Sequence, residues 1–254
     1  MARYPRYSDV GVQFGPGPWS PAVKFLIIAN AVAFIVSEVV PDIVVWLGLM
    51  PAAVFGQLAV WQPLTYMFLH GDLGHLIFNM LALWMFGTDL EREWRTRFFT
   101  KYYFVTGIGA ALITLLWSVS PLPGAAQLFR NVTIGASGAI YGILLAYGLR
   151  FPHRILLFIV FPIPAKYFVM LIGVIAFYYA RAGGGGGVAH VAHLGGLLVG
   201  YVYLKGLRAR PFDELRYRWL RWKMNRARGK FDVYSGGRRP DDDSWKSDWK
   251  KHIH

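Results

Sequence analysis

The sequence predicts an all-α fold: a polytopic membrane protein whose six transmembrane helices form a bundle, with both termini in the cytoplasm. Hydrophobic residues make up 55% of the chain and charged residues only 16%, which is far from the balance of a soluble domain. Apolar stretches also recur that approach the ~20 residues needed to cross ~30 Å of hydrocarbon. The distribution of basic residues then assigns the connections to opposite faces of a membrane.

The predicted spans make up one core, residues 22–204, between a short lead (1–21) and a basic tail (205–254). The first apolar run is long for a signal peptide and no small-residue cleavage site follows it, so we interpret it as a transmembrane helix. The six spans are expected at residues 22–40, 73–90, 102–119, 137–149, 165–180 and 188–204.

Lys and Arg gather in alternate connections, which fixes the expected orientation. Arg92, Arg95, Arg97 and Lys101 lie between the second and third spans, whereas the long connection 41–72 has no basic residue. By the positive-inside rule, both termini are cytoplasmic. The net charge of +13 follows this topology, so nucleic acid is not expected as a partner. We interpret the tail as a solvated extension that fixes topology, with binding to anionic lipid as the alternative.

Candidates for chemistry are polar side chains at the starts of the spans. The chain has no cysteine, which excludes disulfides, thiolate metal sites and a cysteine nucleophile. Polar groups in hydrocarbon are costly and are therefore functional candidates by default. Spans two, four and six run in the same direction, so their first residues are expected at one face of the membrane. Those residues include His75 and Asn79, Ser137, and His193.

Ser137 is the predicted nucleophile and His193 its predicted general base. Ser137 begins a helix, where free N–H groups and the helix dipole favour a developing negative charge. A serine hydroxyl needs an adjacent base to accept its proton, and close contact between the fourth and sixth spans would supply one. Rows of small residues permit such contact. These rows are Gly138 and Gly142 on one span and Gly196 and Gly200 on the other.

Three further side chains complete the predicted site. His75 and Asn79 are four residues apart on one helical face and are expected to stabilise an oxyanion together with the Ser137 backbone N–H. Tyr141 is expected to stack against a neighbour such as His193. We assign no acidic residue to the outer half of a span, so a Ser-His dyad is predicted rather than a triad. Taken singly, each of these residue types is more typical of helix packing, and their coincidence at one depth favours catalysis.

These motifs resemble those of the rhomboid family, and the resemblance covers the predicted core. The family's His-x-x-x-Asn matches His75 and Asn79, and its Gly-x-Ser-Gly matches the segment from Gly135 to Gly138. Its Ala-His followed by glycines at i+3 and i+7 matches Ala192, His193, Gly196 and Gly200. One position departs, because the family's Trp-Arg pair is here Trp61-Gln62, which leaves open how the first connection is held.

The resemblance implies intramembrane proteolysis by a Ser-His dyad, without a cofactor or metal, near the outer boundary of single-span membrane protein substrates. We expect a multi-pass integral protein of a prokaryotic inner membrane. Two alternatives stay open. The first is a catalytically inactive rhomboid-like binder of membrane clients. The second is a membrane metalloenzyme with histidine ligands, namely His70, His75, His190 and His193.

Overall fold

The computed structural model describes residues 15–158, 161–182, 187–209, 219–224 and 226. Most of the predicted lead, the glycines 183–186 and most of the predicted tail lie outside these ranges. The chain divides into two compact units, Met1–Lys205 and Gly206–His254. Only the first unit is described at length, and the predicted domain boundaries stay a prediction.

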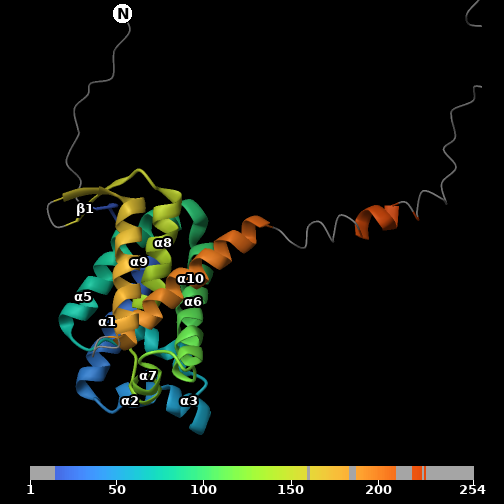
Figure 1. Ribbon diagram of the computed structural model, residues 1–254. Coiled ribbons are helices and arrows are strands. Elements are labelled where there is room, and N and C mark those ends of the chain that lie inside the picture. The colour runs from blue at the N-terminus through green and yellow to red at the C-terminus, as the bar shows by residue number, and fades with distance from the viewer. Residues whose placement is uncertain (1–14, 159–160, 183–186, 210–218, 225, 227–254) are drawn as a thin grey trace, which may run out of the picture. The chain divides into compact units, whose positions relative to one another are not determined.

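Long helices build the first unit (Figure 1). They are α1 (Pro21–Val39), α5 (Leu73–Ala82), α6 (Thr88–Ser118), α8 (Ser137–Arg150), α9 (Ala165–Ala182) and α10 (Gly187–Ala209). Helices α6 and α8 pack along each other at the centre. Short helices fill the connections: α2 (Ile43–Leu47), α3 (Pro51–Gln57), α4 (Gln62–Thr65), the 3-10 turn η1 (Tyr66–Phe68) and α7 (Ala125–Arg130).

Two helical stretches in the described part are long and apolar enough to cross a membrane. One is Pro21–Val39, and the other is the 46-residue stretch Leu73–Ser118. Helix α8 has only 14 residues, which is shorter than a full span. The six-span count and the orientation of the termini stay predictions.

The connection expected between the second and third spans is almost absent. A π-helical turn, η2 (Leu83–Gly87), joins α5 to α6, and helical geometry then continues to Ser118 except at one residue. That residue is Arg95, with φ 66° and ψ 153°. A positive φ is uncommon for a residue other than glycine. The predicted loop of several residues is therefore wrong, since a single residue separates the two helical segments.

The all-α prediction is also wrong in one place. Strands β1 (Ile155–Phe158) and β2 (Phe161–Pro164) pair as an antiparallel hairpin, with Ile155 opposite Pro164. Apolar residues that are β-branched or aromatic favour strands, and this segment between Arg154 and Lys166 is rich in them. We name the end of the first unit that carries β1 and β2 the hairpin end, and the opposite end, where α2, α3 and α7 gather, the short-helix end (Figure 1).

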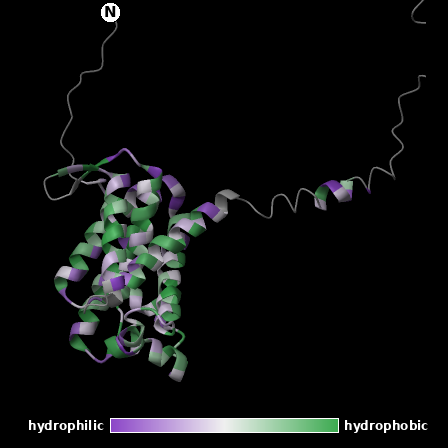
Figure 2. Ribbon diagram, in the orientation of Figure 1, coloured by the Kyte–Doolittle hydropathy of each residue, from purple (hydrophilic) through white to green (hydrophobic). Residues whose placement is uncertain are grey.

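Hydrophobic residues occupy much of the length of the helices (Figure 2), and many large ones are exposed. On α1 the exposed large residues include Phe25, Val32 and Ile35, and on α9 they include Val174 and Tyr178. Soluble monomers rarely expose contiguous apolar patches of this kind, so these surfaces indicate a membrane environment.

A buried carboxylate joins α1 to α6 at the hairpin end. Glu91 is only 2% exposed, and its side chain accepts hydrogen bonds from the Ser20 hydroxyl (2.5 Å) and the backbone N–H groups of Ala22 and Val23 (2.9 and 3.0 Å). The Thr96 hydroxyl donates a further bond of 2.7 Å. The carboxylate thus binds the free N–H groups at the start of α1, where the helix dipole also favours negative charge.

Gln62 holds the first connection at the short-helix end. Its Oε1 accepts from the Met50 N–H at 3.0 Å, and its Nε2 donates to the Trp46 carbonyl at 3.3 Å. The Trp61 indole donates to the same carbonyl at 2.9 Å. Trp61 and Gln62 therefore hold the first connection through side-chain hydrogen bonds, although the pair differs from the Trp-Arg of the family pattern.

Candidate active site

The segment that leads into Ser137 is tied to the first connection. Thr133 pairs with Leu49 through two backbone hydrogen bonds of 2.8 and 2.9 Å, and the Gly135 N–H donates to the Tyr66 carbonyl at 2.9 Å. Gly135 has φ +125°, a conformation that favours glycine. A Cβ there would lie 2.9 Å from His75 Nε2. These contacts set the position at which α8 begins, and so they set the position of Ser137.

Ser137 and His193 are in direct contact although they are far apart in the sequence. Ser137 Oγ lies 2.8 Å from His193 Nε2. The other ring nitrogen, His193 Nδ1, is buried and has no hydrogen-bond partner in the described part of the chain. The Tyr141 ring stacks on the His193 ring, with centroids 4.1 Å apart and planes within 4° of parallel. The imidazole is therefore oriented by an aromatic face and by the serine hydroxyl.

Glycines allow α10 to reach this position. A Cβ on Gly196 would overlap the Gly138 carbonyl oxygen, and one on Gly200 would lie 3.3 Å from Gly142 Cα. The expected rows do meet, but the sides of Gly138 and Gly142 on which a Cβ would lie face α6. Their Cβ positions would lie 2.8 Å from Ala110 Cβ and 2.7 Å from Thr106 Cβ respectively. Small residues thus join three helices where two were expected.

His75 and Asn79 lie one turn apart on α5. Asp72 caps this helix, because its carboxylate accepts the His75 N–H at 2.8 Å. The cap fixes where α5 starts and which face carries His75. Asn79 is 7% exposed, and its Nδ2 has no hydrogen-bond partner among the described residues. A buried amide donor without a partner is costly, so Asn79 carries a donor that is free to bind an anionic oxygen.

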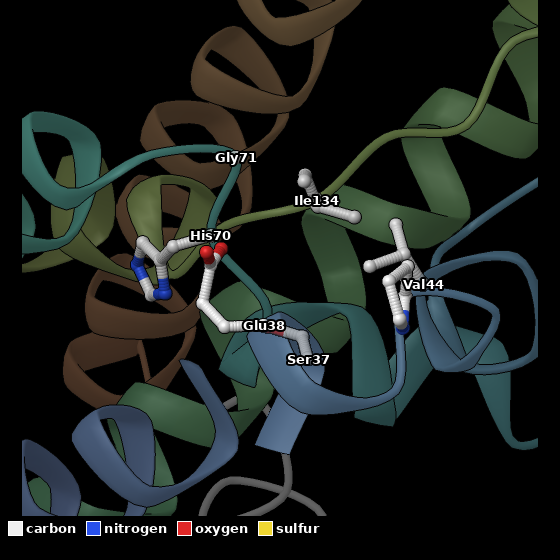
Figure 3. A pocket seen from close by; sticks show the side chains of 7 residues that line it. Ser37, Glu38, Val44, His70, Gly71 and Ile134 are labelled. Atoms are coloured by element: carbon white, nitrogen blue, oxygen red, sulfur yellow. The ribbon is translucent and has the colours of Figure 1, made fainter. Parts of the chain in front are cut away.

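A pocket of about 250 Å³ is lined in part by Ile134, which belongs to the segment that precedes Ser137 (Figure 3). Glu38, His70, Gly71 and Ile134 are among its lining residues. Glu38 belongs to the outer half of the first predicted span, so the expectation that no acidic residue lies there is wrong. His70 packs edge-on against His75 with centroids 4.9 Å apart. Burial lowers the pKa of His70 to about 4, so its ring is neutral at physiological pH and supports His75 without charge repulsion.

His190 extends the aromatic contacts of the site toward α9. Its ring stacks on Tyr179 with centroids 4.9 Å apart, and it meets the His193 ring edge-on at 5.4 Å. In the described part of the chain, His193 forms a hydrogen bond with Ser137 and His190 does not. In the described ranges, no group of three or more His, Cys, Asp or Glu side chains is arranged to hold a metal ion.

Comparison with known proteins identifies the family of this chain. The family model of the Rhomboid domain matches residues 57–210. The chain belongs to the rhomboid family. Rhomboid proteins are helical, polytopic integral membrane proteins, and the family includes serine proteases.

Curated rhomboid proteins from distant organisms are similar to this chain. "Rhomboid protein 1, mitochondrial" of Saccharomyces cerevisiae is 35% identical over 138 residues, which cover 54% of this chain and 38% of that protein. "Rhomboid protease GluP" of Bacillus subtilis is 34% identical over 146 residues, 56% of this chain and 25% of that protein. "Rhomboid protease AarA" of Providencia stuartii is 37% identical over 91 residues, 34% of this chain and 32% of that protein. The match thus spans less than half the length of each of these relatives.

Two supporting residues were not predicted from the sequence as parts of the site. Tyr66 accepts the Gly135 N–H through its carbonyl and donates its hydroxyl to the Gly107 carbonyl at 2.7 Å, so it links the segment before Ser137 to α6. Gln62 was noted only as a departure from the family pattern. Its proximity to Trp61 was the one signal in the sequence for its role.

Proposed function

We propose that this rhomboid protein is an intramembrane serine endopeptidase that cleaves single-span membrane proteins through a dyad of Ser137 and His193. The observation that carries the proposal is the 2.8 Å contact between Ser137 Oγ and His193 Nε2. That distance is within hydrogen-bond reach for proton transfer from a nucleophile to its base. Six spans, cytoplasmic termini and cleavage near the outer membrane face belong to the same proposal.

In this mechanism Ser137 Oγ attacks the carbonyl carbon of the scissile peptide, and its proton passes to His193 Nε2. The oxyanion that forms is bound by the N–H groups at the start of α8, by Asn79 Nδ2 and by His75. The C–N bond then breaks as His193 returns the proton to the leaving amine. Water next attacks the acyl-enzyme, again with His193 as base, and releases the second product.

Because His193 Nδ1 has no hydrogen-bond partner among the described residues, Tyr141 has a defined part in this mechanism. In a triad an aspartate orients the imidazole and stabilises its protonated form. Here the parallel face of Tyr141 supplies orientation, and an aromatic face also attracts a cation. The protonated His193 formed during the reaction is therefore stabilised by the same ring that positions the neutral one.

Cleavage assays in liposomes separate this proposal from its rivals. The chain is reconstituted with a panel of single-span substrates. Cleavage is then measured in the presence of a serine-reactive fluorophosphonate and, separately, in the presence of a chelator. Loss of cleavage with the first reagent and full cleavage with the second is the expected result. Binding of substrates without cleavage would support the inactive relative, and sensitivity to the chelator would support the metalloenzyme.

The particular membrane in which the chain resides is part of the proposal. Family membership establishes an integral membrane protein. The relatives come from yeast mitochondria and from bacteria, so more than one kind of membrane holds members of the family. We retain the prokaryotic inner membrane as the proposed location. Anionic lipid at the basic tail also stays a proposal, because most of that segment lies outside the described residues.

A further inference from the structure

A groove on the outside of the first unit is the feature on which this inference is based. It has a volume of about 570 Å³ and runs along one face of α6, with Val199 of α10 on its other side. The residues of α6 that line it include Phe104, Ile108 and Leu112. They recur at the spacing of a single helical face. Gly109 has no side chain, and a Cβ there would lie 2.6 Å from Val199.

The single charged residue of this lining is Lys101, at the end of the groove that lies toward Arg95. Lys101 is exposed, and Arg97 is exposed one turn before it on the same helix. The ion pairs found in the described ranges are made by Arg150 and Arg154, and neither includes Lys101 or Arg97. An apolar groove with positive charge at one end is complementary to an occupant with an apolar chain and an anionic head.

The length of the groove matches one leaflet of a bilayer. Its lining on α6 extends from Lys101 to Ile113, a rise of ~18 Å at 1.5 Å per residue. Half of a ~30 Å hydrocarbon core is ~15 Å. An occupant whose head lies at Lys101 would therefore place its tail along the groove to about the middle of the bilayer.

We propose that this groove binds an anionic phospholipid, with one acyl chain along α6 and the headgroup phosphate at Lys101 and Arg97. Basic pockets between transmembrane helices on the cytoplasmic side bind such headgroups. The site is remote in sequence from Ser137 and its occupancy does not depend on proteolytic activity. A second copy of the chain is a poorer occupant, because a symmetric contact would bring Lys101 against Lys101 of the other copy.

Native mass spectrometry of the full chain tests the headgroup contact, with phosphatidylglycerol as probe and phosphatidylcholine as reference. We expect tighter binding of phosphatidylglycerol, and a loss of about fivefold in Lys101→Gln. Lys101→Arg should keep the affinity, because the charge remains. Lys24→Gln is the matched control, since Lys24 is an exposed lysine of α1 outside the groove, and its affinity should change less than about twofold.

A second pair of variants tests the acyl-chain contact. Leu112→Trp fills the groove, whereas Leu116→Trp adds the same bulk one turn further along α6, outside the lining. Only the first should displace the lipid, with unchanged thermal unfolding in both. The proposal is overturned by equal affinity for the two lipids, or by equal losses in Lys24→Gln and Lys101→Gln. Dimers that disappear in Leu112→Trp and not in Leu116→Trp would assign the groove to a second copy and overturn it as well.

Discussion

The two ends of the first unit are held together by different kinds of contact. At the hairpin end, charged side chains join the helices: Glu91 binds the start of α1, Arg154 pairs with Asp89 at 2.7 Å, and Arg150 pairs with Glu93. At the short-helix end, backbone hydrogen bonds, glycine contacts and stacked rings hold Ser137 and His193. The charges at the hairpin end stabilise the scaffold without contacting the site. At the short-helix end the side chains that contact Ser137 and His193 are uncharged, and the Asp72 carboxylate enters the site only as the cap of α5.

This difference has a chemical reason. A fixed charge beside Ser137 or His193 would alter the proton affinity of the groups that the proposed reaction must protonate and deprotonate. Stabilising charge at the opposite end avoids that effect. The comparison therefore predicts that substitutions at the two ends have separable effects. Those at the short-helix end should lower activity, and those at the hairpin end should lower stability.

The largest expected effect is at the short-helix end, in Ser137→Ala and His193→Ala. Each should lower the cleavage rate by on the order of 10⁴- to 10⁶-fold, because neither dyad member acts without the other. Cleavage in liposomes and thermal unfolding are measured together, and the unfolding midpoint should change little. His190→Ala is the matched control: it should lose far less activity, because in the described part of the chain it is His193 and not His190 that forms a hydrogen bond with Ser137. The reverse ranking would assign the base to His190.

Asn79→Ala should give the next largest effect. Its Nδ2, which has no partner in the ranges that the structure describes, is the donor proposed for the oxyanion, and loss of one such donor typically costs ~10²- to 10³-fold in rate. The turnover number should fall while substrate binding is kept, since the donor acts in the transition state. Full turnover with lowered stability would show that Asn79 is a packing residue.

At the hairpin end, Glu91→Gln should lower stability by roughly 2–4 kcal/mol, because hydrogen bonds to a buried charged group are lost and an amide N–H₂ faces N–H donors. Unfolding in detergent by heat or denaturant measures this loss. The cleavage rate per folded molecule should be unchanged. A fall in that rate to the level of Asn79→Ala would contradict the separation of the two ends.

The smallest expected effect is in Gln62→Ala, which removes the side-chain bonds that pin the first connection and should cost about 1–2 kcal/mol locally. Limited proteolysis within residues 41–60 should become faster, with a few-fold lower activity. Gln62→Arg should be milder, because a guanidinium donates to the same carbonyl of Trp46. Equal cutting rates in the wild type and Gln62→Ala would remove Gln62 from the supporting structure.

Much of the candidate site could be predicted because its signals are local. His75 and Asn79 share a helical face by spacing alone, and the glycines beside Ser137 and His193 mark where helices approach. Other features depend on tertiary contacts that spacing does not report. The left-handed Arg95, the partners of Gln62 and the β1–β2 hairpin are of this kind. The presence of Glu38 in the outer half of the first predicted span could have been predicted, since its position near the end of that span is visible in the sequence.

The single residue between the two segments of the Leu73–Ser118 stretch has a consequence for biosynthesis. With only Arg95 between them, the segments have no separate loop and are expected to enter the bilayer as a pair. The α1 groups that bind Glu91 have already been synthesised by then, so this part of the scaffold can assemble while the ribosome is still making the rest. Ser137 follows, and His193 is translated last of the site residues. Under the proposed mechanism, a partly made chain therefore contains a prepared framework but no general base, and it should not cleave its neighbours in the membrane before α10 has been synthesised.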